Sequence, residues 1–278
     1  MPRKDEGFFS SKDSTRLYWH LALPDAPPTA FVAIVHGYAD HTGRYLRTID
    51  ALVARGFGVM SFDYRGHGKA DGKRGDVERF ERFIDDLEAF WAKVRAEAGS
   101  TPTFVLAHSH GALIATHWAL KRPEGLKGLI FSSPYYKLAF EPPAVKLFAA
   151  RLIKGLLPAL HLGNELKADQ LSRDEAWQKE TLADPLYFHV TTPRWFFEHT
   201  AAQAALASRG TDLTQPLFVV AGDSDPIASM PAARAFFETV ASRDKTWKEY
   251  AGFRHEVLNE VGRESVWDDI SQWISAHR

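Results

Sequence analysis

Residues 101–120 have the sequence TPTFVLAHSHGALIATHWAL, which combines a strand, a sharp turn and a helix. Residues 103–107 form a short apolar run that is typical of a buried strand. From Gly111 onward, the apolar residues recur at helical spacing. Ser109 stands at the corner, with Ala107 and Gly111 two positions to either side. Glycine is more common at the position of Ala107, but any small side chain satisfies the turn. The stretch therefore predicts a nucleophile elbow, which presents a serine hydroxyl at the start of a helix.

The composition is that of a globular protein and excludes several functional classes. Hydrophobic residues make up 45% of the 278 residues and charged residues 25%, as in ordinary globular proteins. The formal net charge of −1 argues against a dedicated nucleic-acid surface, which needs a basic excess. The chain has no cysteine, so disulfides, thiolate nucleophiles and Cys-ligated metals are excluded.

Targeting signals are not evident in the sequence. Residues 1–14 carry charges but lack an apolar segment of signal-peptide length, and no later run reaches about 20 apolar residues. We therefore expect a cytoplasmic protein.

Short apolar segments alternate with amphipathic ones along most of the chain. This alternation is typical of an α/β fold with a mostly parallel sheet and helices on both faces. Eight strands are expected, at 7–10, 16–23, 31–35, 57–62, 103–107, 126–132, 217–221 and 246–250. Helices are expected at 44–55, at 80–98, from 111 onward and at 231–240, with a final helix that ends at 274.

The alternation stops between residues 134 and 210. This segment offers amphipathic helices at 145–157, 173–183 and 195–208, and no convincing strand. We therefore expect a core of residues 1–133 and 211–278, with an all-helical cap, residues 134–210, inserted after the sixth strand on the side where Ser109 emerges.

A serine nucleophile needs a base and a carboxylate that orients the base. In an open α/β sheet these partners lie on loops at the carboxyl ends of strands. His255 follows the last strand, and Asp223 and Asp225 both follow the strand at 217–221. Asp225 is favoured as the carboxylate, because Asp223 is better suited to holding the turn through local backbone hydrogen bonds. The order Ser109, Asp225, His255 is the chain order of α/β-hydrolases.

Two backbone N–H groups are expected to form an oxyanion hole. One belongs to His110, directly after the serine, and the other to Tyr38, in the loop after the strand at 31–35. His36, His41, His108 and His110 could suggest a metal site. However, two histidines on either side of a sharp turn point their rings apart, so we expect no metal and interpret His108 as a packed side chain.

These motifs together resemble the monoacylglycerol lipase and lysophospholipase branch of the α/β-hydrolases, the serine aminopeptidase S33-type hydrolases. The resemblance rests on segments that span nearly the whole chain: HGYADHTGRY at 36–45, DYRGHG at 63–68, HSHG at 108–111, LSRD at 171–174, GDSD at 222–225 and HE at 255–256. It implies hydrolysis of carboxylic esters through an acyl-enzyme, with Ser109 as nucleophile, His255 as base, Asp225 as its carboxylate, and no cofactor. A methionine or leucine is common in the family where this chain has His110, which predicts a more polar pocket floor.

The cap should select the substrate, a small ester or a lipid. The segment 143–157 is apolar with interspersed Lys146, Arg151 and Lys154, so either it packs on the core or it forms an acyl channel whose edge touches micelles or membranes. The candidate substrate-binding residues are Tyr135, Leu147, Phe148, Trp195 and Phe196.

Other activities remain open at this point. A short-chain carboxylesterase would use the same residues. A proline-type aminopeptidase would need an acidic group in the cap for the substrate ammonium, for which Glu141, Glu165 and Glu198 are candidates. A non-catalytic binding protein of this fold is a further alternative, although all three catalytic positions are filled.

Overall fold

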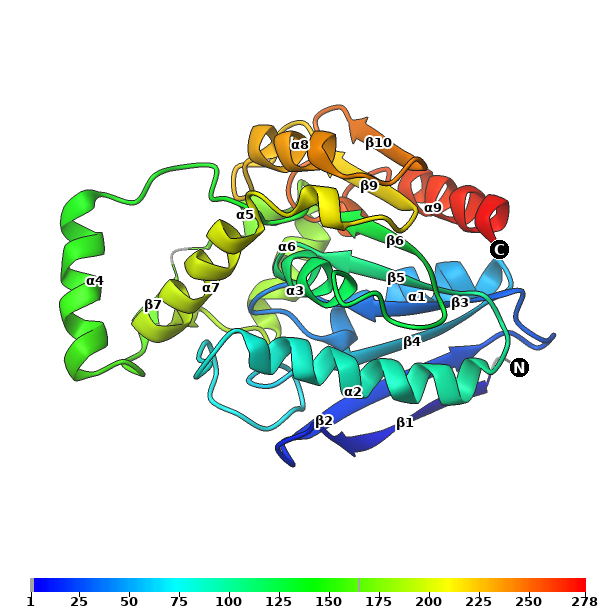
Figure 1. Cartoon of the computed structure of the whole chain (residues 1–278), viewed down its shortest axis with the longest axis horizontal. Coiled ribbons are helices and arrows are strands. Elements are labelled where there is room, and N and C mark those ends of the chain that lie inside the picture. The colour runs from blue at the N-terminus through cyan, green and yellow to red at the C-terminus, as the bar shows by residue number, and fades with distance from the viewer. Residues whose placement is uncertain (1–2, 165) are drawn as a thin grey trace.

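The computed structural model describes residues 3–164 and 166–278 and has an eight-stranded sheet at its centre (Figure 1). The order of the strands is β1-β2-β4-β3-β5-β6-β9-β10. β1 pairs antiparallel with β2, and β2 pairs antiparallel with β4. All the other neighbouring strands are parallel. The strands are β1 (Arg3–Ser10), β2 (Arg16–Leu23), β3 (Ala30–Val35), β4 (Phe57–Asp63), β5 (Thr103–His108), β6 (Leu126–Ser132), β9 (Leu217–Gly222) and β10 (Lys245–Tyr250). The predicted α/β fold with a mostly parallel sheet is confirmed.

Helices cover both faces of this sheet because its central strands are apolar on both sides. In β3, Phe31, Ala33 and Val35 face one core, and Ala30, Val32 and Ile34 face the other. The first core lies under α2 (Glu81–Ala98), α3 (His110–Ala119) and α8 (Met230–Thr239), and the second under α1 (Leu46–Ala54) and α9 (Glu264–His277). A short 3-10 helix, η1 (Thr42–Tyr45), precedes α1, and another, η3 (Val257–Asn259), precedes α9.

The chain leaves the sheet after β6 and returns at β9. The segment between them holds α4 (Ala144–Leu156), α5 (Ala168–Leu171), α6 (Glu175–Ala183) and α7 (Pro193–Leu206), followed by the 3-10 helix η2 (Gly210–Asp212). The prediction of a segment without strands was wrong. β7 (Leu162–Gly163) pairs antiparallel with β8 (Val190–Thr191). Two-residue strands are too short for alternation to appear in the sequence, and α5 has a single turn.

Hydrogen bonds join this segment to the core at several places among the described residues. The backbone of Ala139 bonds to Ile227 (N···O 2.9 Å). The side chain of Asp76 accepts bonds from Thr192 and Arg194. Near α5, the N–H of Glu256 donates to the carbonyl of Leu171 (2.8 Å). α4 differs from its neighbours, because none of its residues is buried and it projects from the rest of the molecule (Figure 1).

Candidate active site

Ser109 lies in the turn between β5 and α3, in a backbone conformation that is unusual for a residue other than glycine. Its φ is 51° and its ψ is −118°. Such strain persists only where the surroundings fix it, and it is found most often at functional sites. Two contacts fix it here. The N–H of Ser109 donates to the Ser132 carbonyl (2.9 Å). A Cβ on Gly111 would lie 2.4 Å from the carbonyl oxygen of Val35, so the start of α3 packs directly on the end of β3.

The structure brings Ser109, His255 and Asp225 together from three loops at the carboxyl ends of parallel strands. Ser109 Oγ lies 2.8 Å from His255 Nε2, and His255 Nδ1 lies 2.7 Å from Asp225 Oδ2. The other oxygen of Asp225 accepts from the backbone N–H groups of Ile227 (2.8 Å) and Ala228 (3.0 Å), which fixes the carboxylate. The side chains of His255 and Asp225 are buried. This chain of contacts is the arrangement in which a histidine takes a proton from a serine.

Asp223, the other candidate carboxylate, points elsewhere. It is exposed, and its Oδ1 accepts from the backbone N–H of Gly252 (2.7 Å) and from the hydroxyl of Ser224 (2.9 Å). It therefore joins the loop after β9 to the loop after β10, whereas local backbone hydrogen bonds within its own turn were expected.

The electrostatic surroundings favour a proton on His255. Burial alone would lower the pKa of His255, but the charge and hydrogen bond of Asp225, and then the charges of Glu256 and Asp40, outweigh it. The pKa of His255 therefore lies above its ordinary value. A raised pKa stabilises the imidazolium that forms when the serine proton is transferred.

The two segments expected to supply oxyanion donors meet at Ser109. His110 is the first residue of α3, where backbone N–H groups have no partner within the helix. Tyr38 follows Gly37, whose approach is so close that a Cβ there would lie 3.0 Å from the His108 ring and 3.6 Å from Ser109 Cβ. The loop after β3 is thus held against the serine turn, as a second oxyanion donor from that loop would require.

The flanking histidines have packed side chains. His108 Nδ1 lies 3.1 Å from the carbonyl of Ser132, and burial lowers the pKa of His108 to about 3. The ring of His110 is buried between Phe83 and Trp195, and its Nδ1 lies 3.2 Å from the Tyr64 hydroxyl. The prediction that His110 makes the pocket floor more polar was therefore wrong, because the ring lies in the core behind the serine. In the described part of the chain, no three His, Asp or Glu side chains are grouped to hold a metal ion.

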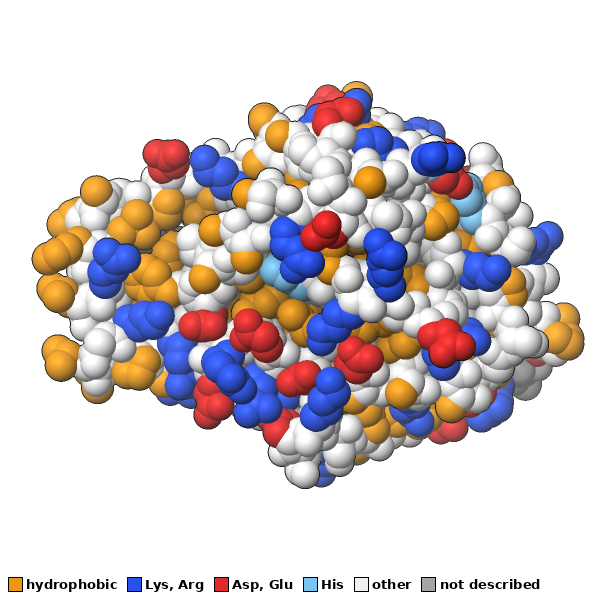
Figure 2. Space-filling model, viewed as in Figure 1, with side chains coloured by type: hydrophobic (Ala, Val, Ile, Leu, Met, Phe, Trp, Pro, Cys, Tyr) orange, Lys and Arg blue, Asp and Glu red, His pale blue; other side chains and the backbone are white. Residues whose placement is uncertain are grey.

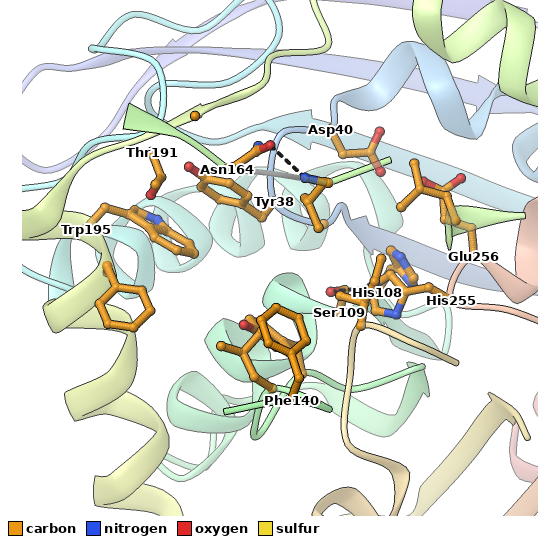
Figure 3. Close-up of a pocket in the computed structure, with 18 of the residues that line it drawn as sticks. Tyr38, Asp40, His108, Ser109, Phe140, Asn164, Thr191, Trp195, His255 and Glu256 are labelled. Atoms are coloured by element: carbon orange, nitrogen blue, oxygen red, sulfur yellow. Dashed lines mark hydrogen bonds between the residues drawn. The ribbon is translucent and has the colours of Figure 1, made fainter. Parts of the chain in front are cut away.

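A cavity of about 250 Å³ opens above Ser109 (Figure 3). Ser109, His108 and His255 lie at one side of it, with Asp40 and Glu256 beside them, and Trp195 and Thr191 lie at the opposite side. Most of the remaining lining is apolar or aromatic and comes from the segment between β6 and β9, including Leu138, Phe140, Leu166 and Tyr187. A cavity of this kind suits an apolar substrate with one polar reacting group.

Three of the five candidate substrate residues line this cavity: Tyr135, Trp195 and Phe196. Leu147 and Phe148 do not. Both face a neighbouring hollow between α4 and α7, and 65% of Phe148 is exposed. The apolar pattern of α4 extends over a wide face, so the sequence alone does not show which of its residues turn inward.

A buried ionic cluster next to His255 was not identified from the sequence. Arg44 contacts Asp40 (Nε···Oδ1 2.7 Å) and Glu256 (Nη2···Oε1 2.9 Å), and its Nη1 donates to Thr181 in α6 (2.7 Å). Trp177, also in α6, donates to Glu256 (2.6 Å). The i,i+4 spacing of Asp40 and Arg44 was a signal, but nothing local links them to residues 177 and 256.

The strand order, the serine turn and the loops that carry His255 and Asp225 define an α/β-hydrolase. The chain belongs to the family described as serine aminopeptidase, S33, whose model matches residues 26–262. This confirms the resemblance inferred from the sequence motifs.

Named relatives in this family are lipases. The monoacylglycerol lipase of Mycolicibacterium smegmatis is 30% identical over 275 residues, which cover 99% of this chain and 98% of that protein. Phospholipase YtpA of Bacillus subtilis is 30% identical over 241 residues, 86% of this chain and 92% of that one. The crystal structure of the Paleococcus ferrophilus monoacylglycerol lipase has a TM-score of 0.80 at 26% identity and covers 100% of both chains.

Proposed function

We propose that this protein is a carboxylic ester hydrolase that cleaves single-acyl-chain lipids, as a monoacylglycerol lipase or lysophospholipase does. The observation that carries the proposal is the Ser109–His255–Asp225 chain of contacts at the wall of a largely apolar cavity. The lipase and phospholipase relatives at 30% identity support it. In this proposal residues 134–210 act as a cap over a core of residues 1–133 and 211–278.

The geometry gives each group one role in the reaction. Ser109 Oγ attacks the ester carbonyl while its proton passes to His255 Nε2, and Asp225 keeps the other ring proton on Nδ1. The N–H groups of Tyr38 and His110 stabilise the oxyanion. His255 then protonates the leaving alkoxide, and an acyl-enzyme remains on Ser109. Water, deprotonated by His255, attacks the acyl carbonyl, the bond to Ser109 Oγ breaks, and His255 returns the proton to Ser109 as the fatty acid leaves.

We expect activity to rise with acyl length, because Trp195, Phe196 and Phe140 offer apolar surface to a chain attached at Ser109. The measurement is kcat/KM for p-nitrophenyl esters from C2 to C16, beside 1-monooleoylglycerol and lysophosphatidylcholine. An optimum at medium or long chains is expected, and the two lipids rank the head groups. Activity confined to C2–C4 would contradict the proposal and leave a short-chain carboxylesterase.

The surface of α4 suggests how the enzyme reaches its substrate. Hydrophobic side chains gather over the end of the molecule where α4 projects, with basic ones beside them (Figure 2). One stripe of α4 is exposed at 57–83%: Val145, Phe148, Leu152 and Leu156. Lys146, Arg151 and Lys154 supply positive charge on the same helix. In our proposal α4 lies on the surface of an anionic bilayer or micelle. In the described residues, no helix is both long and apolar enough to cross a membrane.

The double variant Phe148→Ser/Leu152→Ser is expected to bind anionic vesicles of phosphatidylglycerol and phosphatidylcholine about 10-fold or more weakly, since burying each side chain contributes about 1.5–3 kcal/mol. Its hydrolysis of a water-soluble ester should not change, because Phe148 lies outside the cavity of Ser109. Vesicle co-sedimentation and a p-nitrophenyl butyrate assay measure the two properties. Leu182→Ser, which changes an exposed leucine in α6, is the matched control. Equal binding by the double variant and this control would refute the role of α4.

The aminopeptidase alternative finds less support among the residues. Glu141 is exposed and lies near Lys137 (3.7 Å), and Glu198 accepts from the backbone N–H of Phe80 (3.2 Å). Glu165 lies outside the described residues. The two carboxylates that line the cavity, Asp40 and Glu256, already share Arg44. Among the described carboxylates of this set, each therefore already has a partner other than a substrate ammonium.

A further inference from the structure

Glu256, the residue after His255, is buried and held by four separate segments. Arg44 of η1 donates to both of its oxygens (2.9 and 3.1 Å). Trp177 of α6 and Asn259 of η3 donate to Oε2 (2.6 and 3.1 Å). Its backbone N–H donates to Leu171 at the end of α5. A buried carboxylate with four such contacts is fixed in position, and so is the loop that carries His255.

The cluster keeps a negative charge on Glu256. Burial would raise the pKa of Glu256, but the charge of Arg44 and the hydrogen bonds of Trp177 and Asn259 outweigh it, so this pKa lies below its ordinary value. In contrast, burial raises the pKa of Asp40, which shares the same guanidinium. Glu256 is thus the carboxylate of the pair whose ionised form is favoured by its surroundings.

We propose that Glu256 is a positioning residue for His255: it bonds the histidine loop to α6 of the cap and sets a fixed negative charge beside the ring. This inference rests on the proposed function, in which His255 is the base. His255 must reach Ser109 and Asp225 at the same time, and both contacts depend on where its loop lies. The imidazolium formed in each cycle is buried, and Asp225 bonds to only one edge of it.

Several charged or titratable groups besides Glu256 lie near His255, and the test must separate their effects from that of Glu256. The loop after β9 supplies Asp225, and the loop after β3 supplies Asp40 and Arg44. The His108 ring lies 4.9 Å from the His255 ring, and its pKa of about 3 leaves it neutral in an assay near pH 7. From the cap, Tyr187 packs on Arg44 with a pKa raised by burial, so it too is uncharged. Within the described residues, the change of one charge at Glu256 can therefore be tested against a fixed background.

Glu256→Gln keeps the size of the side chain and removes its charge. His255 acts as a base only when neutral, so activity falls as the pH drops through its pKa. Since the charge of Glu256 raises that pKa, the variant should lose activity at a lower pH, with the acid limb of kcat/KM shifted down by about half a unit or more. We also expect kcat to fall by about 10-fold with KM nearly unchanged, because the substrate does not need the charge.

Two further variants separate charge from position. Trp177→Phe removes the bond to α6 and keeps the charge, so kcat should fall while the acid limb stays in place. Glu180→Gln changes an exposed carboxylate of the same helix, paired with Arg47, and should change neither property. Wild-type kcat and an unshifted acid limb in Glu256→Gln would overturn the proposal. So would a kcat in Trp177→Phe that equals that of Glu180→Gln.

Should Glu256→Gln melt below the assay temperature, Glu256→Asp takes its place. It keeps the charge but draws it back from Trp177, so a reduced kcat with a wild-type acid limb is expected, and an unchanged kcat would refute the positioning role. The pH dependence of Ser109 labelling by a fluorophosphonate is recorded for every variant. This reaction needs the serine and histidine but no ester, so it separates failure of this inference from failure of the proposed function.

Discussion

Replacing Ser109 by alanine is expected to lower kcat for ester hydrolysis by about a million-fold, which is the scale of losing the nucleophile of a serine hydrolase. Alanine fits the turn as well as serine does, because both residues must adopt the same positive φ of 51°. The variant should therefore fold, with its cavity intact. Only the oxyanion donors and substrate binding remain to assist water, and these alone give a small residual rate.

Hydrolysis of p-nitrophenyl butyrate, with circular dichroism to verify folding, measures this effect. Ser265→Ala, which removes an exposed hydroxyl in α9, is the control and should match the wild type. A fluorophosphonate should label the wild type and the control but not Ser109→Ala. Residual hydrolysis within about 100-fold of the wild type would mean that another group attacks the ester.

Asp225→Asn is expected to lower kcat by about 10⁴-fold at neutral pH. An asparagine amide can donate to His255 Nδ1, and that nitrogen must then give up its own proton. The ring proton moves to Nε2, the nitrogen that should accept from Ser109 at 2.8 Å. The geometry survives while the tautomer is wrong.

Asp223→Asn is the matched comparison, because it makes the same chemical change two residues away. Its carbonyl oxygen can still accept from Gly252, so we expect nearly wild-type kcat. Stopped assays of both variants at pH 7 and pH 9 measure the difference. If Asp223→Asn were the inactive one, the carboxylate assignment would be reversed.

Much of the fold and site could be predicted because their signals are local. Each central strand is a short apolar run, and Ser109 follows β5 directly, while Asp225 and His255 lie in the loops after β9 and the edge strand β10. The β7–β8 pair could not be predicted, since Leu162 and Thr191 pair across a long stretch of chain and each strand has two residues. The direction of Phe148 was equally hidden, because α4 is apolar on more than one side.

The Arg44 cluster shows the same limit for charged residues. Its members come from positions 40, 44, 177, 181 and 256, which form two i,i+4 pairs and one single residue that lie far apart in the sequence. A buried guanidinium is satisfied only by partners that the tertiary fold supplies. The sequence can therefore show that these residues exist, but not that they meet.

The contacts of Arg44 also affect which parts of the protein unfold together. The guanidinium of Arg44 contacts Asp40 in the loop after β3, Thr181 in α6 and Glu256 in the loop of His255, so loosening any of these segments leaves a charge buried without its partners. α6 should consequently unfold together with the sheet, as one cooperative unit. α4, which buries no residue, lies outside that unit and can open at little cost in free energy. α4 can therefore move away from the core while the loop that carries His255 keeps its place.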